Sequence, residues 1–194
     1  NQKHQGLELE TKVKPTDKIE LDFIASYGNW KFDGDADGTY QEQEYNDNNQ
    51  VIGVTTTEYS YALDGLYVGD MPQTSYILGL TYKPIKGLRL QALYKTYDRN
   101  YADWSPESRE VEGDADRAQV WEAPGYSKLD LHASYKLPIK GYDISLNAHV
   151  FNALDDIFVQ DAVDNSKYNG WGDKVHAPHN AEVFLGTPRY ANIG

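Results

Sequence analysis

One acidic stretch of the chain combines the residue types and the spacing of a calcium-binding loop. Its carboxylates fall at positions one, three, five and twelve of a twelve-residue string, and Gly38 at position six permits a sharp turn. The predicted ligands are Asp33, Asp35, Asp37, Thr39 and Glu44. Because carboxylate and carbonyl oxygens suit a hard cation, we predict Ca²⁺ as a candidate cofactor. An ordinary solvated loop is the alternative, since no flanking helix is evident.

Five aromatic residues in the long connections are candidates for contact with a ligand. Exposed rings stack on sugars, porphyrins or catechols, and they can equally well pin one loop to another. The sequence leaves both roles open. The residues are Tyr101, Trp104, Trp121, Tyr168 and Trp171.

Histidines provide the remaining candidate ligands. His176 and His179, with Glu182 nearby, could supply nitrogen and oxygen to a metal or a metal chelate, and two ordinary loop histidines are the alternative. His132 and His149 fall on the predicted polar faces of neighbouring strands, where polar lining is the simplest role and substrate contact the alternative. We find no nucleophile elbow, phosphate loop or paired-carboxylate signature, so we do not predict an enzyme.

These residues lie on, or between, strands in which apolar and polar residues alternate. A period of two predicts β-strands with one apolar and one polar face. Tight turns at 15–18, 84–87 and 138–143 join six of the strands into three hairpins. The seven predicted strands are 7–13, 19–28, 76–83, 88–95, 128–135, 144–150 and a last one that begins at 189.

The negative charge of the chain is concentrated in the long connections. The net charge is −12, and residues 33–73 contain nine acids and no base. Residues 98–125 contain eight acids and three bases. A phosphate backbone would meet repulsion at these loops, so we do not predict a nucleic-acid partner. Cations, metal ions or neutral polar ligands suit acidic loops better.

The composition excludes membrane-spanning helices but fits a membrane barrel. Mean hydropathy is −0.70, and no apolar run approaches 18 residues. Barrel strands need only one apolar face, and the 16 Tyr and four Trp fit the aromatic girdles of a barrel. A soluble carbohydrate-binding β-sandwich would also alternate. Tyr at the ends of the apolar faces and charges in mid-strand favour the barrel. The absence of cysteine excludes disulfides and thiolate metal sites.

Short turns on one side and long acidic connections on the other are typical of an outer-membrane barrel. We therefore predict an all-β protein, specifically a fragment of a transmembrane antiparallel β-barrel. The first and seventh strands run in the same direction, so we expect further strands outside this chain to close the barrel. Residues 1–20 lack an apolar stretch, so we expect any secretory leader upstream of them.

Five segments together resemble the C-terminal part of a TonB-dependent outer-membrane receptor of the Bacteroidetes type. The resemblance spans essentially the whole chain. The segments are HQGLELE (4–10), VGDMPQ (68–73) leading into LGLTY (78–82), YSKLDL (126–131), NAHVFNALDD (147–156) and LGTPRY (185–190).

This resemblance implies a barrel of roughly 22 strands, of which residues 1–194 would supply about the last seven. It further implies a plug domain and a TonB-contacting segment, both outside this chain. The implied function is TonB-driven import of a scarce nutrient: a metal chelate, a cofactor or an oligosaccharide. Implied partners are the lipid bilayer, TonB and, as a further candidate, a surface lipoprotein. The acidic loops would face the exterior and the short turns the periplasm. A passive porin or adhesin-type barrel is the alternative.

Overall fold

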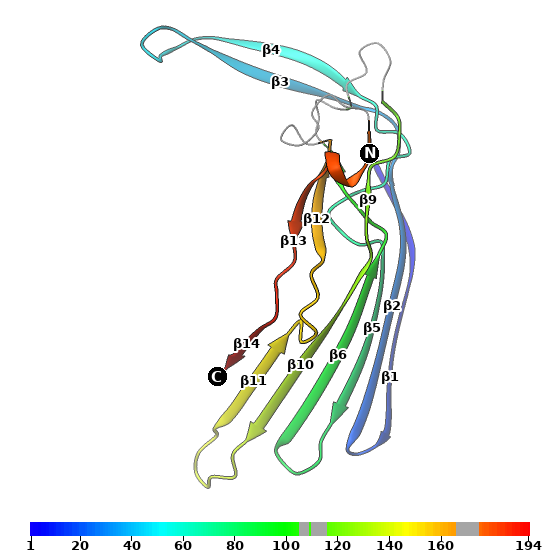
Figure 1. Cartoon of the computed structure of the whole chain (residues 1–194), viewed down its shortest axis with the longest axis vertical. Coiled ribbons are helices and arrows are strands. Elements are labelled where there is room, and N and C mark those ends of the chain that lie inside the picture. The colour runs from blue at the N-terminus through cyan, green and yellow to red at the C-terminus, as the bar shows by residue number, and fades with distance from the viewer. Residues whose placement is uncertain (105–108, 110–115, 166–174) are drawn as a thin grey trace.

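The computed structural model describes residues 1–104, 109, 116–165 and 175–194. Its main element is one antiparallel sheet of seven strands in chain order, which forms a curved wall (Figure 1). The strands are β1 (Gln2–Thr16), β2 (Ile19–Phe32), β5 (Thr74–Tyr82), β6 (Leu88–Asp98), β10 (Tyr126–Lys136), β11 (Ser145–Phe151) and β14 (Tyr190–Ile193). All seven predicted strands are confirmed, and most extend further than predicted toward the long connections.

The register of the sheet aligns apolar and polar residues in alternating rows. One row crosses all seven strands with aliphatic side chains: Val13, Leu21, Leu80, Ala92, Leu131, Val150 and Ala191. The adjacent row is polar from β2 to β14: Glu20, Thr81, Gln91, His132, His149 and Asn192. Because successive residues of a strand point to opposite faces, the sheet has one apolar and one polar face.

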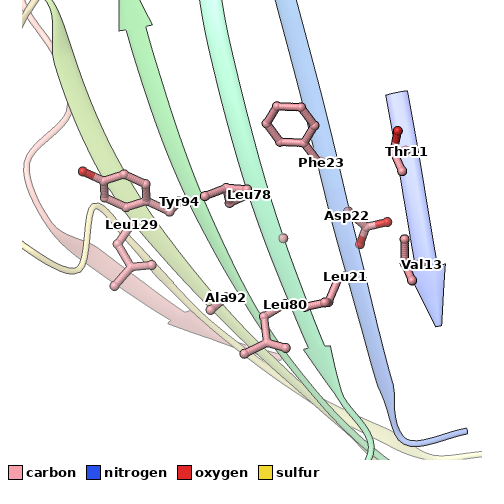
Figure 2. Close-up of a pocket in the computed structure, with 11 residues that line it drawn as sticks. Thr11, Val13, Leu21, Asp22, Phe23, Leu78, Leu80, Ala92, Tyr94 and Leu129 are labelled. Atoms are coloured by element: carbon pink, nitrogen blue, oxygen red, sulfur yellow. The ribbon is translucent and has the colours of Figure 1, made fainter. Parts of the chain in front are cut away.

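The apolar face is open to its surroundings along its whole width. Leu80 is 47% exposed and Leu131 is 39% exposed, although both lie in the middle of their strands. Figure 2 shows the side chains of Leu21, Leu80 and Ala92 on three neighbouring strands, around a hollow of about 480 Å³. Leu80 and Leu131 share one face instead of packing between two sheets, so the β-sandwich alternative is wrong.

Ion pairs hold the polar face together. The Lys12 ammonium lies 3.2 Å from a carboxylate oxygen of Asp22 on the adjacent strand. Lys95 donates to Asp130 at 2.8 Å, and the other Asp130 oxygen accepts the backbone N–H of Asn152 at 2.9 Å. The predicted division of the strands into an apolar and a polar face is therefore confirmed, with charged residues in mid-strand on the polar side.

The two ends of the sheet differ sharply. The turns between β1 and β2, β5 and β6, and β10 and β11 are short and lie together at the lower end in Figure 1. The long connections all leave from the opposite end. We call their described residues in 61–73, 99–125 and 152–189 the loop layer. Gly69 belongs to a close contact within it, because a Cβ there would lie 2.8 Å from the backbone of Ala102.

Several short elements of the long connections were not predicted from the sequence. A two-stranded hairpin, β3 (Ala36–Tyr45) with β4 (Val51–Tyr61), projects away from the sheet (Figure 1). The loop layer contains a three-stranded and a two-stranded sheet and one 3₁₀ turn. These elements are β7 (Asn100–Tyr101), β8 (Asp103–Trp104), β9 (Glu122–Ala123), β12 (Val159–Asp164), η2 (Pro178–Asn180) and β13 (Glu182–Leu185).

The buried apolar core of the described residues lies in the loop layer and not in the seven-stranded sheet. The core residues are Ala62, Leu63, Leu66, Tyr101, Ala102, Val120, Ala123, Phe158, Ala162 and Ala181. The buried residues of the seven strands are Gly28, Thr74, Gly79, Thr81 and Asp130. Within the described ranges, no helix has the length and apolar character needed to cross a membrane.

Candidate functional site

The predicted calcium loop is replaced by the β3–β4 hairpin. Asp37 and Glu44 lie on the same extended strand, seven residues and therefore roughly 23 Å apart. Asp37 accepts a hydrogen bond from Ser60 at 2.6 Å, and Glu44 accepts one from Thr55 at 2.8 Å. Thr39 pairs with Glu58 across the hairpin. The β-strand geometry of residues 36–45 therefore keeps the predicted ligands from surrounding one ion.

Asp35 has protein partners in place of a cation. Arg117 donates to both of its carboxylate oxygens, at 2.9 and 2.7 Å, and the backbone N–H groups of Leu63 and Asp64 add bonds of 3.0 and 3.1 Å. The hydrogen bonds from Arg117 hold the pKa of Asp35 well below its usual range. Asp33 is exposed and lies in the short connection between β2 and β3. Among the described residues, no group of three or more His, Cys, Asp or Glu could hold a metal ion.

His176 belongs to a buried charged cluster in the loop layer. Its Nε2 lies 2.8 Å from Asp116, and its Nδ1 contacts Asp164. The guanidinium of Arg109 lies 3.7 Å from the Asp116 carboxylate and 3.9 Å from that of Asp164. The side chain of Arg109 is fully buried, and that of His176 is 9% exposed. The cluster thus joins β12 to two segments that are remote from it in the sequence.

The charges of this cluster balance when His176 is protonated. The hydrogen bond to Asp164 raises the pKa of His176, despite the opposing effects of burial and of the Arg109 guanidinium, which lies 3.3 Å from its Nδ1. Burial lowers the pKa of Arg109, while the two carboxylates favour its charged form. Two cations then face two carboxylates, which is the arrangement that makes buried charges tolerable. We call Arg109, Asp116, Asp164 and His176 the loop clamp.

The second predicted histidine does not join His176. His179 lies in η2 and is exposed, whereas His176 is held by the loop clamp. Glu182 lies in β13, opposite Val163. His176 is therefore held by the loop clamp, whereas His179 and Glu182 lie on two consecutive elements.

Three of the predicted aromatic contacts can be located, and two of them pack against other rings. Tyr101 is buried and stacks on Tyr67, with 4.1 Å between ring centroids. Trp104 contacts Phe32 edge-on at 6.1 Å. Trp121 is half-buried, and its backbone N–H donates to Asp164. These contacts connect loops, and ligand contact by the rings stays a prediction. Tyr168 and Trp171 lie outside the described residues.

His132 and His149 form the closest histidine pair of the described structure. They are register partners on β10 and β11, and their Nδ1 atoms lie 2.8 Å apart. Phe151 contacts both rings, at centroid distances of 5.4 Å from His132 and 6.0 Å from His149. The predicted position of both histidines on the polar face is confirmed.

Sequence reasoning missed Arg109, Asp116 and Asp164 as partners of His176. The available signal was the scarcity of bases: residues 98–125 contain only three, surrounded by eight acids. Each of these three arginines has a structural role. Arg109 and Arg117 pair with acids, and Arg99 donates to the backbone carbonyl of Gly28 at 2.7 Å. A few bases within a strongly acidic stretch therefore indicated that each one makes a tertiary contact.

Comparison with known proteins places the chain in a family. A family profile described as "TonB dependent receptor-like, beta-barrel" matches residues 1–153. No curated protein matches the sequence. Among solved structures, the chain is similar to the ferric-catecholate import receptor Fiu of E. coli K12 in its closed form, at 14% identity and a TM-score of 0.41. It is also similar to the copper transporter OprC, at 14% identity and a TM-score of 0.39.

Each of these two similarities covers 99% of the present chain, which spans 27% of the Fiu chain and 30% of the OprC chain. The antiparallel wall with one apolar and one polar face defines a piece of an outer-membrane β-barrel. The chain belongs to the family of TonB-dependent receptor β-barrels. Proteins of this family are outer-membrane transporters and not enzymes.

Proposed function

We propose that this chain forms part of the wall of an outer-membrane receptor that imports a scarce nutrient with energy supplied through TonB. Membership of the family supports this proposal. The observation that carries it is the division of the molecule into a lipid-compatible wall and a folded loop layer at one end (Figure 1). A passive pore needs the wall, whereas a receptor also needs a shaped surface that meets its ligand.

In this proposal the loop layer and the β3–β4 hairpin face the exterior, and the three short turns face the periplasm. Outer-membrane barrels have long extracellular loops and short periplasmic turns. The polar face of the sheet then lines the lumen, and the apolar face contacts lipid. The partners are the bilayer, the remaining strands, a plug in the lumen, and TonB, which would act through a region outside this chain. A surface lipoprotein is a further candidate partner of the loop layer.

The proposed substrates are a metal chelate, a cofactor or an oligosaccharide. The connections carry most of the acids of the chain, so a strongly anionic polymer would be repelled, whereas a cationic or neutral polar ligand would not. Tyr40 and Tyr45 of the hairpin are more than half exposed, and such rings can stack on sugars or planar cofactors.

Growth of the native bacterium on limiting nutrients tests the transport proposal. Ferric chelates, a cobalt-containing cofactor and oligosaccharides are offered separately to the wild type, to a strain without this gene and to a strain without TonB. We expect loss of the gene and loss of TonB to abolish growth on the same nutrient class. Uptake that requires the gene but persists without TonB would instead identify a passive porin.

Cysteine labelling of whole cells tests the orientation. Residues 1–194 contain no cysteine, so a new thiol reports one position in this part of the receptor, and the receptor without the new thiol is the control. Asn48→Cys places the thiol in the turn of the β3–β4 hairpin, and Lys140→Cys places it in the turn between β10 and β11. We expect a membrane-impermeant maleimide to label the first in intact cells and the second only after lysis. The reverse pattern would contradict the proposed orientation.

A further inference from the structure

The His132–His149 pair has the geometry of two ligands to one metal ion. The two residues are directly opposed across β10 and β11, where antiparallel partners hold their Cβ atoms within about 5.5 Å. Their Nδ1 atoms are 2.8 Å apart, so without a metal one nitrogen donates a proton to the other. An imidazole nitrogen that lacks its proton is the commonest protein ligand of transition metals.

The distance between the two nitrogens indicates which ion fits. Two nitrogens that each lie about 2.0–2.1 Å from one ion are separated by about 2.9 Å when the angle at the metal is 90°. They are separated by about 3.3 Å at a tetrahedral angle. The observed 2.8 Å is the length of the hydrogen bond between the two rings, so a 90° angle at the metal would require the smaller movement of the imidazoles. Square-planar or tetragonal coordination by nitrogen and oxygen is the preference of Cu²⁺ and Ni²⁺, whereas Zn²⁺ favours the tetrahedron.

The surroundings of the pair provide rigidity and polar neighbours. Phe151 contacts both imidazole rings and itself stacks on Tyr190, with 4.7 Å between ring centroids. Gln91 is the register partner of His132 on β6, and Asn192 is the register partner of His149 on β14. The polar row thus places an amide side chain on each side of the pair. The Gln91 oxygen accepts a hydrogen bond from Arg89, so the Asn192 amide oxygen or a water molecule can complete the coordination.

Charged groups near the pair already have partners of their own. Asp130, two residues from His132 on the same face, binds Lys95 at 2.8 Å. Arg89 donates to Gln91 at 3.2 Å and to Thr81 at 3.3 Å. Because these charged groups are already paired, the two histidines are the side chains of this part of the polar face that we assign as metal ligands.

We propose that His132 and His149 form a two-imidazole binding site for a divalent transition-metal ion on the polar face of the wall. Cu²⁺ is the preferred ion and Ni²⁺ the second, because affinity for nitrogen ligands rises from Ni²⁺ to Cu²⁺. The site is independent of the nutrient that the receptor imports. It requires neither TonB nor an energised membrane, so metal binding and transport can fail separately.

Titration of the purified full-length receptor with CuCl₂ tests this site. The protein is prepared in detergent without a polyhistidine tag, and electron paramagnetic resonance counts the nitrogens bound to Cu²⁺. We expect at least two nitrogen ligands in the wild type. In His132→Gln or His149→Gln we expect loss of at least one of these ligands and a fall in affinity of at least about tenfold. His179→Gln, an exposed histidine of the loop layer, is the matched control and should change neither.

Unchanged affinity and an unchanged nitrogen count in both wall variants would overturn the proposal, because the ion would then bind elsewhere. Heat-modifiable migration on gels verifies that each variant is assembled. Should a Gln variant fail to assemble, the folded wild type still decides, since a spectrum with fewer than two nitrogens contradicts the site. Competition adds a second readout: Ni²⁺ should displace Cu²⁺ more effectively than Zn²⁺ does, and the opposite order would contradict the proposed geometry.

Discussion

The seven-stranded wall and the loop layer differ in whether their apolar side chains are exposed or buried. In the wall, leucines such as Leu80 remain about half exposed, and the buried residues are small or polar. In the loop layer, Leu63, Leu66 and Phe158 are withdrawn from solvent as in a soluble protein. The wall relies on the surrounding lipid to cover its apolar face, whereas the loop layer has a buried apolar core of its own.

This difference teaches that the two regions should respond differently to the same kind of mutation. A charge is costly on the apolar face of the wall because of the bilayer, and is tolerated on the polar face. In the loop layer a charge is tolerated only where a partner neutralises it, as in the loop clamp.

Removal of the buried guanidinium should have the largest effect, and that effect should be confined to the loop layer. Arg109→Ala leaves the carboxylates of Asp116 and Asp164 with His176 as their one cationic partner in the loop clamp, which we expect to cost about 3–5 kcal/mol of local stability. Hydrogen exchange should accelerate at Val120 and Ala162 but not in β5 or β10. Arg189→Ala, which removes an exposed partner of Asp155, is the matched control. Equal acceleration in the wall would contradict the separation of the two regions.

A charge introduced on the apolar face should have the second-largest effect, and it should destabilise the wall. Leu131→Arg places a guanidinium toward lipid near the middle of β10, at an expected cost of about 2–4 kcal/mol for folding into a bilayer. Asn147→Arg puts the same side chain on the polar face of the adjacent strand and should cost much less. Urea-dependent folding of the full-length receptor into lipid vesicles measures both. Similar costs for the two variants would mean that the faces are not distinct.

The loop layer should also depend on pH in a direction set by His176. Its pKa is raised in the folded protein by the hydrogen bond to Asp164, so its stabilising charge is fully present below the unfolded pKa of about 6.5. This contribution is lost as the pH rises through the folded pKa. Proteolysis within the loop layer should therefore quicken on going to alkaline pH, and His176→Gln should remove that dependence. Slower proteolysis at alkaline pH in the wild type would contradict the assignment.

The smallest effect is expected for the exposed ion pair between Arg117 and Asp35. Surface ion pairs contribute little to stability because water screens them, even when the contact is bidentate. Arg117→Ala should leave the thermal unfolding of the receptor unchanged within error. Its local effect should be greater mobility of the whole β3–β4 hairpin, measured by a spin label at position 48 in the hairpin turn. A large loss of thermal stability would show that this pair, and not the loop clamp, holds the loop layer.

The wall was predictable because each of its strands lies between two different environments. Alternation of Leu129, Leu131 and Ala133 with charged or polar residues reports those environments directly in the sequence. The same alternation determines the register, since a shift of one residue would exchange the two faces. The sequence therefore predicted both the positions of the strands and the face of the sheet on which His132 and His149 lie.

The hairpin and the loop clamp were not predictable by the same reasoning. Both strands of the hairpin are largely exposed on each face, so residues such as Gln41, Glu42 and Gln43 show no apolar period of two. The spacing of the acidic residues in this segment matched a calcium-loop pattern, which is why a cation site was predicted there. The loop clamp depends on contacts between residues 60 apart, such as Asp116 and His176. Local periodicity contains no information about such contacts, and only the scarcity of bases pointed toward them.

Accessibility along a single strand tests the division of the wall into two faces most directly. Spin labels are placed one at a time at positions 128–134 of β10 in the full-length receptor reconstituted in bilayers, and collision with oxygen is compared with collision with a polar nickel chelate. We predict a period of two, with oxygen favoured at positions 129, 131 and 133 and not at 128, 130, 132 and 134. Accessibility without that period, or with the two sets exchanged, would contradict the account.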